Sequence, residues 1–89
     1  MFQQTIILPN INDVYDFHKK ISAVNCNVDL NAQNFKYAID AKSLMGILSM
    51  DLTKPVILTA NTDDPVIIDK INKAIEGKIL KEENDAEFA

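Results

Sequence analysis

Two side chains in this sequence, Ser43 and His18, are of types that accept a phosphoryl group in proteins. Ser43 follows Lys42 and stands directly before a short apolar run, where a serine caps the start of a helix. A phosphoserine there would face unpaired backbone N–H groups and the positive end of the helix dipole. Two interpretations of Ser43 stay open: a phosphorylation site, or a plain capping residue.

His18 is the only histidine, and it is followed by Lys19 and Lys20, which would attract phosphate. It lies about two turns into an expected helix, where backbone N–H groups are already bonded within the helix. His18 is therefore either a displaced phosphoacceptor or an ordinary histidine on the flank of an amphipathic helix. Its position favours the second interpretation.

No other constellation in the chain supplies catalytic chemistry. A single cysteine, Cys26, and a single histidine argue against a metal site. Ser22 and Ser49 have no adjacent base, and two glycines are too few for a phosphate-binding loop. We expect a protein that is not an enzyme and that has no cofactor and no metal.

The bulk properties restrict the class of protein further. The 89 residues suffice for one domain, and 47 % apolar with 25 % charged residues is an ordinary globular balance. The net charge is −4, and all nine basic residues are lysines, which argues against a nucleic-acid surface. Without a signal peptide or an apolar run of about 20 residues, we expect a cytoplasmic protein with no membrane partner.

The first half of the chain predicts a strand, a helix and a hairpin. Phe2 to Leu8 is β-prone and ends at Pro9. Asn10 caps a helix that ends near Asn25, whose apolar face has the spacing of Ile11, Val14, Phe17, Ile21 and Val24. Two alternating runs then flank a polar turn at residues 31 to 34 and predict two antiparallel strands, the second containing Phe35, Tyr37 and Ile39.

The second half predicts a short helix, a strand and a longer helix. The short helix covers Ser43 to Met50, and the strand covers Pro55 to Ala60. Asp63 or Asp64 before Pro65 starts the last helix, and Gly77 ends it. The order β-α-β-β-α-β-α predicts an α+β fold, a four-stranded antiparallel sheet with three helices on one face. We expect one domain over residues 1–80 and a charged, frayed tail over 81–89.

The segment from Asp40 to Ser49 resembles the regulatory-serine segment of the HPr family, the phosphocarriers of the bacterial sugar phosphotransferase system. Pro55 to Ala60, followed by Asp63 and Asp64, is similar to that family's fourth strand and last helix cap. The resemblance implies the family's open-faced β-sandwich over the whole domain. It also implies a bacterial protein concerned with sugar transport and carbon catabolite regulation.

The family's carrier site has no counterpart in this chain. HPr proteins place a His-Ala-Arg-Pro stretch at the start of the first helix, where N–H groups and the arginine hold the phosphoryl group. Here the junction from Pro9 to Val14 contains neither histidine nor arginine, and the family's spacing from Ser43 falls near Asn10 to Asn12. Asp13 adds an unfavourable negative charge. The resemblance thus implies a divergent member without the phosphoacceptor histidine.

The family's regulatory site does have a counterpart, which is Ser43. In that family, HPr kinase/phosphorylase modifies the matching serine, and the modified protein binds the catabolite control repressor. The following helix contacts these proteins and enzyme I, so the resemblance implies a docking surface at Leu44, Met45, Ile47 and Leu48. The alternative for these side chains is self-association or tighter core packing.

Three functions follow from these observations. The first is a regulatory binding module that docks protein partners and is phosphorylated at Ser43. The second is an active phosphocarrier that relays a phosphoryl group through His18. The third is an HPr fold reused for an unrelated protein interaction, with Ser43 serving only as a cap.

Overall fold

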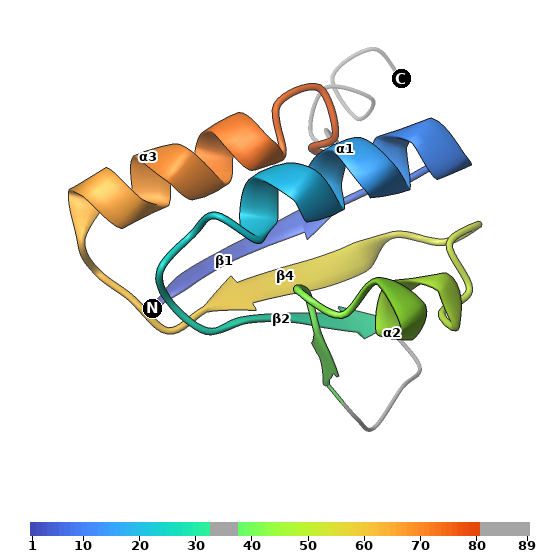
Figure 1. Ribbon diagram of the computed structural model, residues 1–89, viewed down its shortest axis with the longest axis horizontal. Helices are drawn as coiled ribbons and strands as arrows, with labels where there is room; N and C mark the ends of the chain where they lie inside the picture. Colours follow the sequence, from blue (N-terminus) through green and yellow to red (C-terminus); the bar gives the residue numbers. More distant parts are fainter. Residues whose placement is uncertain (33–37, 81–89) are drawn as a thin grey trace, which may run out of the picture.

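The structure is a computed structural model that describes residues 1–32 and 38–80, and its described elements follow the predicted order. Figure 1 shows the sheet with its helices on one face. The elements are β1 (Phe2–Ile6), α1 (Ile11–Ile21), β2 (Val28–Ala32), β3 (Ile39–Asp40), α2 (Leu44–Leu48), β4 (Val56–Ala60) and α3 (Pro65–Ala74). The predicted α+β class and the four-stranded antiparallel sheet with three helices are confirmed.

The strands lie in the order β1-β4-β2-β3, and every neighbouring pair is antiparallel. β4 runs between β1 and β2, so that Ala60 pairs with Phe2 on one side and Val28 on the other. The predicted hairpin is confirmed by the pairing of β2 with β3. The predicted start of its turn at Asn31 is wrong, because Asn31 pairs with Ile57 of β4 and β2 continues to Ala32. The rest of the predicted turn and the strand positions Phe35 and Tyr37 lie outside the described residues.

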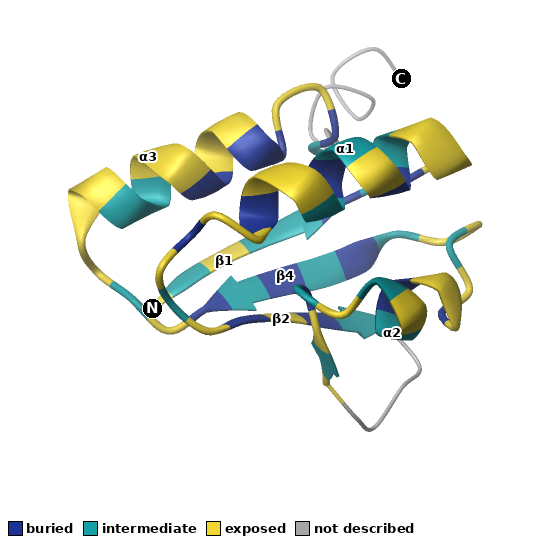
Figure 2. Cartoon of the chain, viewed as in Figure 1, coloured by how far each residue is buried: buried dark blue, intermediate teal, exposed yellow. Residues whose placement is uncertain are grey.

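The core lies between the sheet and the helices, as the dark segments of Figure 2 show. Alternate residues of β4 are buried, as the period of a strand requires. They meet the inner faces of two helices, Val14, Phe17 and Ile21 of α1 and Ile71 and Ala74 of α3. Ile11 was predicted to belong to this face and does not, since its side chain is 48 % exposed. At about 3.6 residues per turn, Ile11 lies about 120° around α1 from Phe17.

Each helix begins at the residue that the sequence predicts. Asn10 Oδ1 accepts a hydrogen bond from the Asp13 N–H at 3.0 Å, and Ser43 Oγ accepts one from the Gly46 N–H at 3.1 Å. Asp64 caps α3 in the same way, with Pro65 in the first turn. These side chains satisfy backbone donors that a helix start leaves unpaired.

The chain after α3 returns to the outer edge of β1. Gly77 turns the backbone with a φ of 78°, a conformation that glycine adopts without strain. The Ile7 N–H then donates to the Lys78 carbonyl at 2.7 Å, and the Leu80 N–H donates to the Thr5 carbonyl at 3.1 Å. This pairing covers an edge that would otherwise present unpaired groups. No helix within residues 1–32 and 38–80 is long and apolar enough to span a membrane, and the predicted tail at 81–89 lies outside this range.

Candidate functional site

The junction between β1 and α1 is occupied by a helix-capping residue, Asn10. Asn10 is exposed, and its side-chain oxygen already accepts the hydrogen bond from the Asp13 N–H. The Asp13 carboxylate stands in the first turn of α1. The helix dipole stabilises a negative side chain at this position, but the carboxylate would repel a second anion bound there.

His18 lies in the last turn of α1 and is bonded to the segment before α2. Its Nε2 is 2.9 Å from the carbonyl oxygen of Lys42. Because a carbonyl oxygen only accepts, the proton must be on Nε2 and the imidazole donates. Ser22 Oγ is 3.5 Å from the same nitrogen, and it donates instead to the His18 carbonyl at 2.7 Å. His18 thus connects α1 to the residue that precedes Ser43.

Ser43 stands at the end of a tight turn whose other bonds are local. The Asp40 side chain accepts a hydrogen bond from the Lys42 N–H, and the Asp40 carbonyl accepts one from the Ser43 N–H, both at 2.9 Å. The next helix, α2, contains no charged residue. Ser43 itself is exposed. Its hydroxyl is therefore held in a fixed turn and is accessible from solvent.

The predicted docking helix exposes two of its four named side chains widely. Met45 is 81 % exposed and Leu48 is 41 % exposed. Leu44 is partly buried against the core. Ile47 is fully buried, so its predicted place on the docking surface is corrected. One turn and a half of helix presents only one flank to solvent, and Ile47 lies on the opposite flank.

Gly46 allows α2 to lie close against β3. A Cβ at this position would lie 2.7 Å from Cγ2 of Ile39 and 3.1 Å from Ser43 Oγ. The first distance is shorter than real Cβ atoms show, so any side chain at this position would require Ile39 or α2 to shift. The absence of a side chain at Gly46 therefore allows α2, and the Ser43 turn that precedes it, to lie close to Ile39.

The helix α1 adds two exposed apolar side chains that the sequence analysis missed. Ile11 is 48 % exposed and Tyr15 is 50 % exposed. They are followed by His18 at helical spacing, and His18 contacts Lys42, so this flank of α1 faces the start of α2. We call the four exposed side chains the α1–α2 surface: Ile11, Tyr15, Met45 and Leu48. Figure 2 shows exposed segments on both helices. The four-residue spacing of Ile11 and Tyr15 indicates one helix flank. Ile11 also fits the apolar pattern of the core face, so the sequence alone does not identify this flank as exposed.

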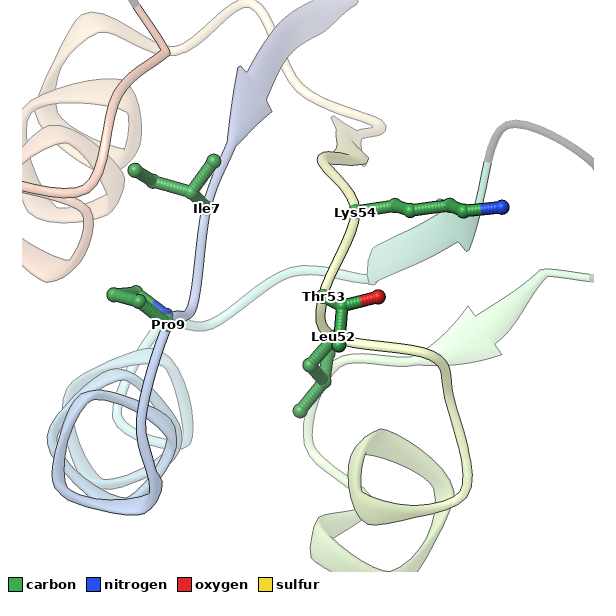
Figure 3. Close-up of a pocket in the computed structure, with 5 residues that line it drawn as sticks. All are labelled: Ile7, Pro9, Leu52, Thr53 and Lys54. Atoms are coloured by element: carbon green, nitrogen blue, oxygen red, sulfur yellow. The ribbon is translucent and has the colours of Figure 1, made fainter.

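An open hollow of about 410 Å³ adjoins this region, lined by residues of the β1–α1 connection and of the loop before β4. Figure 3 shows Leu52 directed into the space near Pro9, while the Lys54 side chain extends away from Ile7 and Pro9. Three of the lining residues are apolar, and the two polar ones are Lys54 and Thr53. Hydrogen bonds from Thr53 hold the pKa of the neighbouring Asp51 below its ordinary value. The hollow therefore suits an apolar side chain more than a free anion.

Comparison with known proteins identifies the fold. A crystal structure of HPr-C-His from Thermoanaerobacter tengcongensis is similar to this chain, with a TM-score of 0.67 and 25 % sequence identity. The match covers 86 % of this chain and 93 % of that chain. No family model and no curated protein matches the sequence. The chain therefore has an HPr-like fold.

Proposed function

We propose that this chain is a regulatory binding module that docks a protein partner through the α1–α2 surface and is phosphorylated at Ser43. The observation that carries the proposal is the exposure of Met45, 81 %, two residues after an exposed serine. An HPr-like fold supports a protein as the partner in general terms. A methionine this exposed is typical of an adaptable binding surface.

Phosphorylation at Ser43 would change the binding properties of this surface. The modification adds a charge of about −1.5 to −2 beside apolar side chains. A partner with an apolar site would then have to desolvate a dianion, whereas a partner with arginine or lysine beside its apolar site would gain ion pairs. Ser43 would thereby select between two classes of partner. The resemblance names HPr kinase/phosphorylase and the catabolite control repressor, in the cytoplasm, as first candidates, with enzyme I as a further candidate.

The carrier site supports the same proposal by its composition. By the family's spacing the carrier position falls near Asn10 to Asn12, and Asn10 uses its side-chain oxygen as a helix cap. His18 has its Nε2 proton directed to the Lys42 carbonyl and lies in the last turn of α1, far from the unpaired N–H groups at the helix start. Neither residue combines a free imidazole with free backbone N–H donors. The proposal accordingly gives this chain no carrier and no catalytic activity of its own.

Incubation with HPr kinase/phosphorylase and ATP, followed by mass spectrometry of the peptides, tests the phosphorylation. We expect one phosphoryl group, on Ser43, and none in the Ser43→Ala variant. Ser49→Ala is the matched control, because Ser49 is also exposed and lies at the other end of the same helix. An unmodified Ser43 in a folded protein would contradict the proposed switch and favour an unrelated use of the fold.

A second incubation with enzyme I and phosphoenolpyruvate tests the carrier alternative. We expect no acid-labile label on the native chain. A label that disappears in the His18→Ala variant would establish the carrier function instead. Absence of modification in both incubations would leave the third interpretation, in which Ser43 is only a helix cap.

A further inference from the structure

We propose that His18 is the internal binding partner of a phosphoryl group on Ser43, so that phosphorylation replaces a neutral hydrogen bond between α1 and the Ser43 turn with a charge pair. This inference rests on the proposed modification of Ser43 and concerns what the modified protein does next. It assigns to His18 a positioning role in place of a carrier role.

The geometry brings the imidazole to the peptide group that joins Lys42 to Ser43. The acceptor of the His18 Nε2 proton is the carbonyl oxygen of that peptide, at 2.9 Å. His18 and Lys42 are 24 residues apart in sequence, so this bond is a tertiary contact. Its position is fixed from two sides, because His18 is partly buried and the Ser43 turn is held by Asp40. Ser43, the next residue along the chain, is exposed.

Phosphorylation would offer this imidazole a stronger acceptor. The γ-phosphoryl group of ATP forms a bond to Ser43 Oγ, ADP leaves, and the hydroxyl proton passes to the kinase. The product carries three acceptor oxygens and nearly two negative charges. A charge-assisted hydrogen bond is about twice as strong as a neutral one. A protonated His18 would therefore turn from the Lys42 carbonyl to the phosphoryl oxygens.

The charged groups around His18 permit this change. Within one turn on α1 they are Asp16, Lys19 and Lys20, and Asp16 is already paired with Lys20 and Lys78. On the Ser43 turn they are Asp40 and Lys42, and an Asp40 side-chain oxygen is bonded to the Lys42 N–H.

The helices packed on α1 bring one carboxylate, Asp69 of α3, and it is paired with Lys73. α2 carries no charged residue. α3 packs on the flank of α1 that carries Lys20 and contributes Lys70 and Lys73 there. Within the described part of the chain, no carboxylate is hydrogen-bonded to the imidazole. The incoming phosphate would thus be its first anionic partner.

The test uses the full chain with phosphoserine incorporated at position 43 during translation, so that it does not depend on any kinase. The phosphorus NMR signal is followed against pH in the native background and in the His18→Gln variant. Glutamine keeps a neutral donor but cannot become a cation. A phosphoserine ordinarily loses its second proton near pH 6. We expect that midpoint to be lower by about 0.5 to 1 pH unit in the native background, and equal midpoints would overturn the inference.

Two further measurements separate this role from folding and from the proposed function. Ser22→Ala removes the hydroxyl that lies 3.5 Å from the imidazole without removing the cation, and it should leave the phosphate midpoint unchanged. Because the chain has one histidine, its ring protons give a single set of NMR signals. These signals should shift when Ser43 carries phosphate, and unchanged signals would overturn the inference whatever the stability of the variants. A failed kinase assay would contradict only the proposed function.

Discussion

Lys78 Nζ lies 2.8 Å from Asp16 Oδ2 and joins the segment after α3 to the middle of α1. The Lys78 side chain is only 7 % exposed, which is unusual for a lysine. Lys20 Nζ lies 3.3 Å from the same carboxylate oxygen. Hydrogen bonds from Lys78 and then from Lys20 hold the pKa of Asp16 below its ordinary value of 3.8. The contact closes the fold at the point where the chain turns back to β1.

The lowered pKa of Asp16 predicts a loss of stability in acid. A carboxyl group with a lowered folded-state pKa contributes stability that is fully present above its unfolded value. That contribution is lost as the pH falls below 3.8 and through the lower folded-state pKa. Asp16→Asn should therefore destabilise the protein at about pH 7 and reduce the loss between about pH 4 and pH 2. Urea unfolding across this range measures both effects.

Asp69→Asn is the matched control for this prediction. Asp69 also pairs with a lysine four residues along its helix, Lys73, but both side chains are mostly exposed. Exposed pairs of this kind contribute about 0 to 1 kcal/mol. The Asp69 variant should keep the acid response of the native chain. An Asp16 variant with the same acid response as the Asp69 variant would show that Lys78 does not stabilise the carboxylate.

The close approach at Gly46 predicts that alanine is destabilising although alanine favours helices. The new Cβ would lie 2.7 Å from Ile39 Cγ2. Overpacking of this kind costs about 1 to 3 kcal/mol, against a gain of about 1 kcal/mol in helix propensity. We expect Gly46→Ala to lower the free energy of unfolding by about 1 kcal/mol. Adding Ile39→Ala removes the opposing methyl group, and a double-mutant cycle should then give a favourable coupling energy. No coupling would contradict the steric explanation.

The sequence predicts the elements of this fold better than the exposure of their side chains. Helix starts were found because Asn10, Ser43 and Asp64 cap locally, within three residues of the donors that they satisfy. The exposure of Ile11 and the burial of Ile47 depend on how each helix is rotated against the sheet, which an apolar pattern leaves open. That rotation is fixed by tertiary packing.

Local sequence patterns do not predict contacts between residues that are far apart in the chain. The bonds of His18 to Lys42 and of Lys78 to Asp16 join residues 24 and 62 positions apart. A lone histidine and a lysine near the end of a helix carry no signal that identifies such partners. The candidate site could therefore be predicted as far as Ser43 and the exposed side chains of α2, while the contribution of α1 required the structure.

The cap at Asn10 predicts that its oxygen stabilises α1. Asn10→Ala removes the acceptor of the Asp13 N–H and should cost about 1 kcal/mol in the free energy of unfolding. Asn10→Asp keeps the acceptor and adds a negative charge at the helix start, so it should retain the native stability. Thermal unfolding of the two variants checks this difference. Equal stability of Asn10→Ala and the native chain would contradict the capping role.

The α1–α2 surface predicts that docking and folding respond to different residues. Met45→Ser and Tyr15→Ser should leave the melting temperature nearly unchanged, because both side chains are exposed. Each should weaken recognition by about 1 to 2 kcal/mol, which raises the KM of HPr kinase/phosphorylase for Ser43 about five- to thirtyfold. Ile47→Ala should do the opposite and destabilise the fold by about 2 to 5 kcal/mol, because that side chain is fully buried.

Val66→Ser is the control for a specific docking surface. Val66 is 63 % exposed and apolar, but it lies on α3, which packs on the other flank of α1. Its loss removes exposed apolar area without touching the four side chains of the α1–α2 surface, so the KM should stay at the native value. If Val66→Ser raised the KM as much as Met45→Ser, the kinase would be responding to general surface hydrophobicity. The same KM for the native chain, Met45→Ser and Tyr15→Ser would place recognition elsewhere, at the Ser43 turn alone.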